Sequence, residues 1–192
     1  MFFLHRPSAD SIAAFLAGQR SRDFSYSEVG ATLAEPPRGY RVDRHRVKLG
    51  AGARAFSDAS ACLRAWQMVR LGWLELVEAD TSIEAGSTVA VLARHLGFWS
   101  LNACRIAYVI DEPRHHGFAY GTLGDHAEQG EERFSVRWAD DNSVWYEIVA
   151  FSRPRQWQAR AARPLARRLQ KRFARDSMAA MVRCVRDRGL AR

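Results

Sequence analysis

The chain has 192 residues, which is enough for one ordinary domain with an apolar core but not clearly enough for two. Hydrophobic residues make up 47% of it and charged residues 26%, a balance typical of globular proteins rather than of disordered or membrane chains. No apolar run approaches the roughly 18 residues of a membrane-spanning helix, and the first residues do not resemble a signal peptide. We therefore expect one cytoplasmic domain over residues 1–192, with residues 1–38 as an N-terminal extension.

The net charge of +8 is concentrated near the C-terminus, where thirteen Lys and Arg follow residue 152 against two Asp. Arg160, Arg163, Arg167 and Lys171 fall on one side of an expected helix, and such a face would attract nucleic acid or anionic membrane. The chain has two lysines in all, so an arginine-rich genome composition explains the excess more simply. We favour a solvated face over either partner.

The predicted elements begin with a helix in residues 8–20, which opens with capping-type residues and spaces Ile12, Phe15 and Leu16 at helical intervals. A strand over 39–50 and an amphipathic helix over 54–73 follow. Short β-branched and aromatic runs, bounded by Gly, Pro, Asp or Asn, then predict six strands, at 73–79, 87–97, 101–111, 117–123, 132–138 and 143–151. A long helix of about seven turns begins at Pro164.

This order of elements predicts an α+β fold. Sequential strands with short connections form an antiparallel meander, so we expect a curved antiparallel sheet of about six or seven strands. Such a sheet can wrap around the long C-terminal helix in the helix-grip arrangement, with a cavity between sheet and helix. A small closed barrel is the alternative for the middle of the chain.

Cys62, Cys104 and Cys184 are odd in number, far apart and without a CxxC pair. This pattern indicates neither a disulfide framework nor a zinc site, and we expect each cysteine to be a small core residue. His126 with Glu131 and Glu132 matches no strong metal-binding spacing. We therefore predict no metal and no cofactor.

The stretch "GFAYGTLGDHAEQGEERF", residues 117–134, carries the candidate site. Alternation along a strand puts Tyr120 and Thr122 on one face. On the next strand it puts Glu132 in an apolar row that faces the interior, and Glu131 in a charged, solvent-like row. A carboxylate in the interior needs a partner or a proton, so Glu132 is the focus of the prediction.

Three kinds of partner are conceivable for Glu132. Tyr120 and Thr122 lie on the neighbouring strand, and His126 lies on the loop between the two strands. Arg105 stands among alanines in an earlier strand, from which its guanidinium would reach an acid. Large side chains would form the apolar walls, and the candidates are Trp66, Phe134, Trp138 and Tyr146.

These residues favour a module that binds a small hydrophobic or amphipathic ligand under the C-terminal helix, with Glu132, His126 and Arg105 orienting a polar group. An enzyme on the same scaffold, with His126 and Glu132 as a proton-handling pair, is an alternative. A third interpretation has no ligand at all. In it the polar residues tether a loop, and His126 and Glu131 bond to backbone groups.

Five stretches together resemble a known family. They are "RAWQMVRLGW", "NACRIAYVIDE", "HGFAYGTLGDHAEQGEERFSV", "SVWYEIVAFSRP" and "RPLARRLQKRF", in this order. The chain is similar, from about Tyr40 onward, to the bacterial and plant family called domain of unknown function 1990. The resemblance implies a fold related to the START-like helix-grip superfamily. It does not indicate which activity, if any, the protein has.

Overall fold

The computed structural model describes residues 1–77, 82–95, 97–124, 126, 128–154 and 163–190, with the side chain of Arg163 excepted. Among these residues, the α-helices are Ala9–Gln19 (α1), Gly52–Arg64 (α2) and Arg163–Leu190 (α4), and the 3-10 helices are Ala31–Leu33 (η1) and Gln67–Val69 (η2). The strands are Phe2–Phe3 (β1), Arg41–Ala51 (β2), Leu74–Val77 (β3), Thr88–His95 (β4), Phe98–Glu112 (β5), His115–Thr122 (β6), Glu128–Trp138 (β7) and Ser143–Pro154 (β8).

Seven strands form one antiparallel sheet in the order β2-β8-β7-β6-β5-β4-β3, and β1 pairs with β5 beside it. Every consecutive pair from β3 to β8 is a neighbour in the sheet, as a meander requires. The predicted α+β fold, with a curved antiparallel sheet against a long C-terminal helix, is confirmed. The meander does not close into a barrel, because β2 and β3 remain its two edges.

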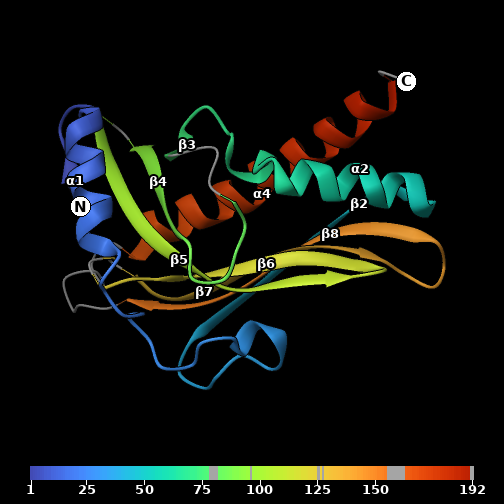
Figure 1. Ribbon diagram of the computed structural model, residues 1–192, viewed down its shortest axis with the longest axis horizontal. Helices are drawn as coiled ribbons and strands as arrows, with labels where there is room; N and C mark the ends of the chain where they lie inside the picture. The colour runs from blue at the N-terminus through green and yellow to red at the C-terminus, as the bar shows by residue number, and fades with distance from the viewer. Residues whose placement is uncertain (78–81, 96, 125, 127, 155–162, 191–192) are drawn as a thin grey trace.

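The sheet bends along β5, its longest strand. The pairing of β5 with β6 shifts register between Ile106 and Tyr108, and such a bulge increases local twist and bends a strand. Figure 1 shows β4 and the first half of β5 rising beside α4, while β6, β7 and β8 run beneath the helices. The bend gives the sheet the curvature with which it wraps around α4 (Figure 1).

The inner face of the sheet packs against α2 and α4, as Figure 1 shows. Large side chains fill this space beneath α2 and the second half of α4, where Trp66, Phe118, Phe134 and Tyr146 are each at most 1% exposed. Trp66 and Phe118 lie with ring centroids 4.8 Å apart. Four buried aromatic rings leave little room here, so this half of the sheet–helix space is a packed core.

The second predicted helix is shorter than expected. It was predicted over residues 54–73, but α2 ends at Arg64 and is followed by η2. Trp66 adopts a left-handed backbone with φ of 56°, which an α-helix cannot continue through. The periodicity of apolar residues continues past this point because Trp66 and Val69 still enter the core, where both are at most 1% exposed.

A disulfide between Cys62 of α2 and Cys184 of α4 corrects the prediction that the cysteines are unpaired. The two residues are 122 positions apart in the chain, and the packing of α2 on α4 brings them together. Their distance in sequence left no spacing pattern that could be recognised. Cys104 is a free, buried thiol, as expected.

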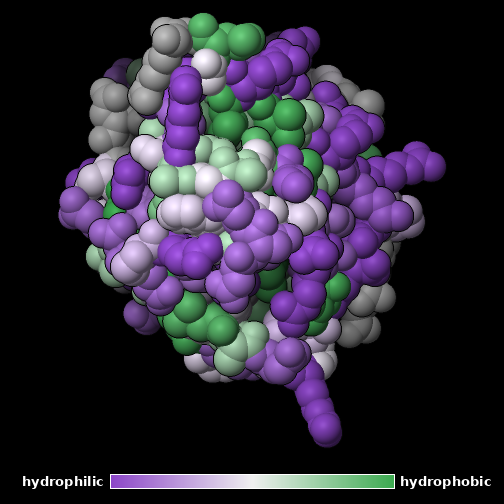
Figure 2. Space-filling model, turned by 90° about the vertical axis from the view of Figure 1, so that its right-hand side faces the viewer, coloured by the Kyte–Doolittle hydropathy of each residue, from purple (hydrophilic) through white to green (hydrophobic). Residues whose placement is uncertain are grey.

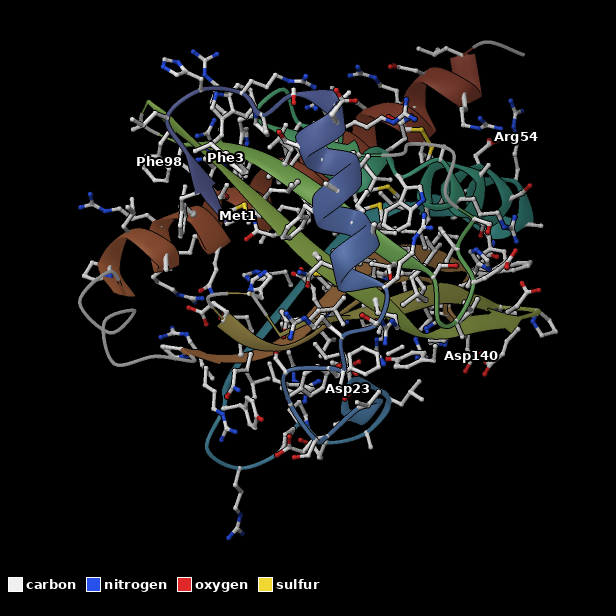
Figure 3. All side chains as sticks on the ribbon, turned by 60° about the vertical axis from the view of Figure 1, so that its left-hand side comes forward. Met1, Phe3, Asp23, Arg54, Phe98 and Asp140 are labelled. Carbon is white, nitrogen blue, oxygen red and sulfur yellow. A yellow bond between two sulfur atoms is a disulfide. The ribbon has the colours of Figure 1, made fainter. Side chains whose placement is uncertain are left out.

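The N-terminal residues cover the outer face of the sheet. Figure 3 shows α1 crossing in front of β4 and β5. A second apolar cluster, which includes Leu16, Leu92 and Leu101, is buried between the helix and these two strands. Residues 24–33, here called the N-terminal strap, then pass across β6, β7 and β8. The part of the outer face under α1 and the strap is therefore covered, whereas the outward-facing residues of β2 are exposed.

The strap is fastened to β7 by Glu131. Its carboxylate accepts hydrogen bonds from Tyr26 Oη (2.8 Å), Gly30 N (2.7 Å), Thr32 N (2.9 Å) and Thr32 Oγ1 (2.5 Å), and the residue is 2% exposed. The prediction that Glu131 belongs to a solvent-like row is therefore wrong. Its row does face away from α4, but the strap supplies polar partners that make burial of a carboxylate tolerable.

Gly121 and Gly130 make room for this contact. A Cβ atom at Gly121 would lie 2.0 Å from the hydroxyl oxygen of Tyr26, and one at Gly130 would lie 1.9 Å from the carbonyl oxygen of Phe151. No side chain fits at such distances, so the two glycines allow the close approach of the strap and of β8.

The end of the molecule away from β1 offers little apolar surface. Figure 2 views the side where the β7–β8 turn and the last residues of α4 lie, and it is largely hydrophilic with small separate apolar patches. Figure 3 labels Arg54 and Asp140 at this end and Met1 and Phe3 at the other.

Reduction of the Cys62–Cys184 disulfide should lower the free energy of unfolding by about 2–4 kcal/mol, because the bond restricts a long loop in the unfolded chain. Urea denaturation with and without dithiothreitol measures the change. A Cys62→Ala/Cys184→Ala variant should unfold like the reduced protein and no longer respond to reductant, whereas Cys104→Ala should keep the response. Thiol counting confirms that the disulfide is reduced. If the urea midpoint of the reduced protein then equals that of the oxidised protein, the prediction is contradicted.

Glu131→Gln should destabilise the protein by about 3 kcal/mol, because an amide cannot accept all the bonds that the carboxylate accepts and its NH₂ would face other donors. Hydrogen exchange of the Gly30 and Thr32 amides should accelerate as well. The matched control is Glu112→Gln, whose side chain is 68% exposed. Equal effects of the two variants on both measurements would argue against the role of Glu131.

Candidate functional site

A cavity of about 340 Å³ lies between the sheet and the first half of α4. Its walls come from the inward-facing residues of the sheet, from the segment after η2 and from α4. Apolar side chains form most of the wall, among them Val69, Trp73, Leu74, Val91, Ile148 and Phe173. Phe2 of β1 also lines it, so the cavity occupies the end of the molecule that carries β1.

The cavity exists because the two halves of α4 differ. In the second half, Ala180, Met181 and Val185 are buried against the packed core. In the first half, Leu169 and Phe173 are only partly buried, and the residues facing them from β8 and β4 include the small Ala150 and Ala93. Small residues opposite partly filled helix positions leave a space that side chains do not occupy.

Glu132 of β7 lines this cavity, on the inner face as predicted. Its Oε2 accepts a hydrogen bond from the hydroxyl group of Tyr120, with 3.1 Å between the oxygens. The two residues are directly paired across β6 and β7, which fixes their side chains on the same face. Among the described residues, Tyr120 is the one hydrogen-bond partner of the Glu132 carboxyl group.

Burial raises the pKa of Glu132 to about 7, and the negative charge of Asp43 adds to this, while the hydrogen bond from Tyr120 opposes it. The same burial holds the pKa of the Tyr120 hydroxyl well above its usual range. A carboxyl group in an apolar cavity prefers the neutral form, since its charge has lost its water. Glu132 therefore changes charge near neutral pH.

His126 also lines the cavity, but its ring is tied to the backbone. Nδ1 accepts a hydrogen bond from the Glu128 amide at 3.1 Å, and burial lowers the pKa of His126 to about 4. The imidazole is therefore neutral at neutral pH. The structure describes no hydrogen bond between His126 and Glu132, so the proton-handling pair that the sequence suggested is not formed in the described residues.

Thr122 is likewise used for tethering. Its hydroxyl lies 2.6 Å from Ser25 Oγ of the strap and accepts a hydrogen bond from the Gly130 amide at 3.0 Å. With His126 and Glu131 also bonded to backbone amides, the loop-tethering interpretation describes these three residues well. It does not describe Glu132.

Arg105 does not meet Glu132. Its side chain lies on the outer face, where it donates hydrogen bonds to the carbonyl oxygens of Gln19 (3.3 Å) and Arg20 (2.9 Å) at the end of α1. The expected contact with an interior acid is therefore wrong. The neighbouring Cys104 lines the cavity instead, because side chains alternate along a strand.

The four expected wall residues lie outside the cavity lining. Trp66, Phe134 and Tyr146 belong to the packed core, and the hydroxyl group of Tyr146 is 2.9 Å from Ser177 Oγ of α4. Trp138 stacks near Phe56 of α2, with ring centroids 6.0 Å apart, at the far end of β7. All four face the helices, but they fill the part of the space that is packed.

Two polar groups of the cavity were not predicted from the sequence. On one wall, His95 Nε2 is 2.7 Å from Ser100 Oγ, which also accepts a hydrogen bond from Asn102 Nδ2. On the opposite wall, the guanidinium group of Arg167 in α4 pairs with Asp43 in β2 at 2.5 Å. Asp43 and Arg167 are 124 positions apart in the chain, so only the tertiary packing brings them together. His95 and Ser100 meet through the pairing of β4 with β5, and no motif marks them.

The basic row on the last helix is also altered by this pairing. Arg167 turns toward Asp43 and the cavity instead of toward solvent. Lys171 is exposed, whereas Arg160 and the side chain of Arg163 lie outside the described part of the chain. The four residues expected to form one basic face therefore do not all share it.

The described residues include no group of three or more His, Cys, Asp or Glu that is placed to hold a metal ion. They also include no helix long and apolar enough to cross a membrane.

The fold and the cavity together define a class of protein. The sheet, the long C-terminal helix and the cavity between them are those of helix-grip proteins (Bet v1/START-like). One solved neighbour is the Zhui aromatase/cyclase from Streptomyces sp. R1128, with a TM-score of 0.55 over 78% of this chain and 95% of that one, at 16% identity. At this identity the likeness shows the fold alone.

The family follows from the sequence comparison. The model described as "Domain of unknown function (DUF1990)" matches residues 25–180. A "UPF0548 protein" of Deinococcus radiodurans is 37% identical over 95% of this chain and 98% of its own length, and one of Dictyostelium discoideum is 32% identical over 96% of both. The chain belongs to the DUF1990 (UPF0548) family, as the resemblance indicated.

Glu132→Gln should stabilise the protein at pH 8 and have little effect at pH 5. The pKa of Glu132 is raised in the folded state, so both states are protonated below about 4.5, and stability is lost as the pH rises from there to about 7. The uncharged amide avoids this loss of stability. The loss reaches about 3 kcal/mol for a difference of this size between the pKa in the folded state and the pKa in the unfolded state. Urea denaturation at the two pH values checks it, with Glu112→Gln as the exposed control. The same change in stability at both pH values would contradict it.

Proposed function

We propose that the protein binds a small apolar or amphipathic molecule in the cavity between the sheet and α4. The observation that carries the proposal is the cavity itself, with about 340 Å³ of space, mainly apolar walls and a few polar side chains that converge on it. Small-molecule sites usually take this form and measure roughly 300–1,000 Å³. Tyr120, His126 and Glu132 are its candidate polar contacts, with Thr122 beside them.

The fold is a second support. Helix-grip proteins often bind ligands, and the Streptomyces neighbour is by name an aromatase/cyclase. A fold hosts many functions, so this support is general and the cavity remains the specific argument.

An enzyme on the same scaffold is the alternative proposal. Its support is that the pKa of Glu132 is about 7. A general acid or base works best when its pKa lies near the pH of the reaction. Because His126 is bonded to the backbone, the proton-handling pair in this alternative is Glu132 with Tyr120.

A cytoplasmic location remains our prediction. The Cys62–Cys184 disulfide runs against it, since cytosolic thiols are usually kept reduced. Counting free thiols in the protein as extracted from cells under alkylating conditions tests this part of the proposal.

Filling the cavity should abolish binding. Ala166 lines the cavity from α4, and Ala179 lies on the exposed face of the same helix. Ala166→Trp should reduce binding of the uncharged fluorescent probe N-phenyl-1-naphthylamine at least about tenfold, because the indole takes the space that the probe needs. Ala179→Trp is the matched control and should bind like the unmodified protein.

Fluorescence titration at pH 7 measures both variants, and circular dichroism verifies that both are folded. A probe that does not bind the unmodified protein, or that binds the Ala166→Trp variant equally well, would refute the proposed cavity function.

A further inference from the structure

The Glu132 carboxyl group has far fewer partners than its buried neighbour. The carboxylate of Glu131 accepts four hydrogen bonds from the strap, two of them from backbone amides. Glu132 accepts one, from Tyr120, and its Oε1 has no partner among the described residues. Glu132 is partly exposed where it lines the cavity, so its under-bonded carboxyl group is open to a ligand that supplies a further donor.

The charges around the cavity favour a cationic donor. Asp43 and Arg167 form an ion pair with each other on one wall of the cavity. His126 is neutral, with a pKa of about 4, and burial lowers the pKa of His95 as well. Among the described lining residues the one arginine, Arg167, is already paired with Asp43, although the chain as a whole carries a net charge of +8.

We propose that the ligand is an apolar amine whose ammonium group pairs with the carboxylate of Glu132, and this inference rests on the proposed binding function. The apolar body of the amine lies against the walls of the cavity. Aromatic side chains among these walls, such as Tyr120 and Phe173, add the cation–π attraction that favours an ammonium group over a neutral one.

Other ligand classes satisfy the site less well. An alcohol donates one hydrogen bond but leaves the carboxylate charge uncompensated. A carboxylic acid brings a second negative charge into an apolar space that already holds Glu132, and like charges at short range are costly there. The amine alone supplies both the donor and the opposite charge.

The pairing has a definite pH dependence. Several other groups face Glu132 from the strands around it, namely Tyr120 on β6, Cys104 on β5, Tyr146 on β8 and Asp43 on β2, which is itself paired with Arg167 of α4. Burial raises the pKa of the two tyrosines and of Cys104, so these three stay neutral. The remaining titratable residues of the described lining are His45, His95, His126, Glu128 and Glu131, of which Glu131 is bonded to the strap. Glu132 ionises around pH 7, so amine binding strengthens as the pH rises from 6 to 8.

Three probes that share one apolar body test the proposal, namely 2-(2-naphthyl)ethylamine, 2-(2-naphthyl)ethanol and 2-naphthylacetate. Isothermal titration calorimetry gives their affinities at pH 6 and pH 8. At pH 8 the amine should bind at least about tenfold more tightly than the alcohol, and the carboxylate most weakly. The amine should lose about tenfold in affinity at pH 6, where most of Glu132 is protonated, while the alcohol should change little.

Two variants assign the effect to Glu132. Glu132→Gln should remove the preference for the amine and its pH dependence while leaving alcohol binding. Tyr120→Phe removes the hydrogen bond that lowers the pKa of Glu132, so the pH at which amine binding strengthens should move upward. Glu112→Gln removes one exposed carboxylate far along β5 and is the charge-matched control.

Equal affinity for amine and alcohol at pH 8, tighter binding of the carboxylate, or an amine preference that survives Glu132→Gln would each overturn the proposal. These outcomes are separable from failure of the proposed function. If N-phenyl-1-naphthylamine binds in a way that Ala166→Trp blocks but the amine is not preferred, the cavity function stands and the amine assignment falls.

Discussion

Two adjacent carboxylates on β7 must both be accommodated in the interior, and much of the structure depends on how this is done. Glu131 and Glu132 point to opposite faces of the sheet because side chains alternate along a strand. On the outer face, the N-terminal strap surrounds Glu131 with hydrogen-bond donors. On the inner face, Glu132 has the hydroxyl group of Tyr120 and an open cavity. One charge is satisfied by the fold, and the other remains available.

The division of α4 into two halves makes this availability possible. Toward the C-terminus the helix packs on aromatic rings and is linked to α2 through Cys62 and Cys184. Toward its N-terminus the same helix faces small residues of the sheet across the cavity. A rigid, packed half therefore holds a helix over an unfilled half, and rigid support of this kind lets a binding site keep its shape without being filled by side chains.

Much of the fold could be predicted from the sequence. The six strands of the middle segment carry strong β-branched and aromatic patterns with clear turn residues between them, and α4 carries a long apolar stripe from Leu169 to Val185. Local periodicity is decisive for such elements. It failed where a single residue overrides it, as at Trp66, whose left-handed backbone ends α2 inside a pattern that reads as one helix.

The candidate site was predictable in part, for the same reason. Alternation alone placed Glu132 on the inner face and put Tyr120 and Thr122 together on one face, and all three line the cavity. Arg105 was assigned to the wrong face, because alternation relates residues within one strand and the phase of β5 relative to β7 depends on pairing and a bulge. Asp43, His95 and Arg167 were missed, since residues so far apart in the chain meet only through packing.

The sequence by itself determined the strand and helix order, the family and the opposite orientation of Glu131 and Glu132, because all three are written in local patterns or motifs. The tertiary structure decided which of these glutamates is free to act. Whether a buried carboxylate finds donors depends on distant segments, and only the folded chain lays the strap over Glu131 while α4 leaves a cavity beside Glu132. Burial and pairing are properties of the whole chain, so no single stretch of sequence contains them.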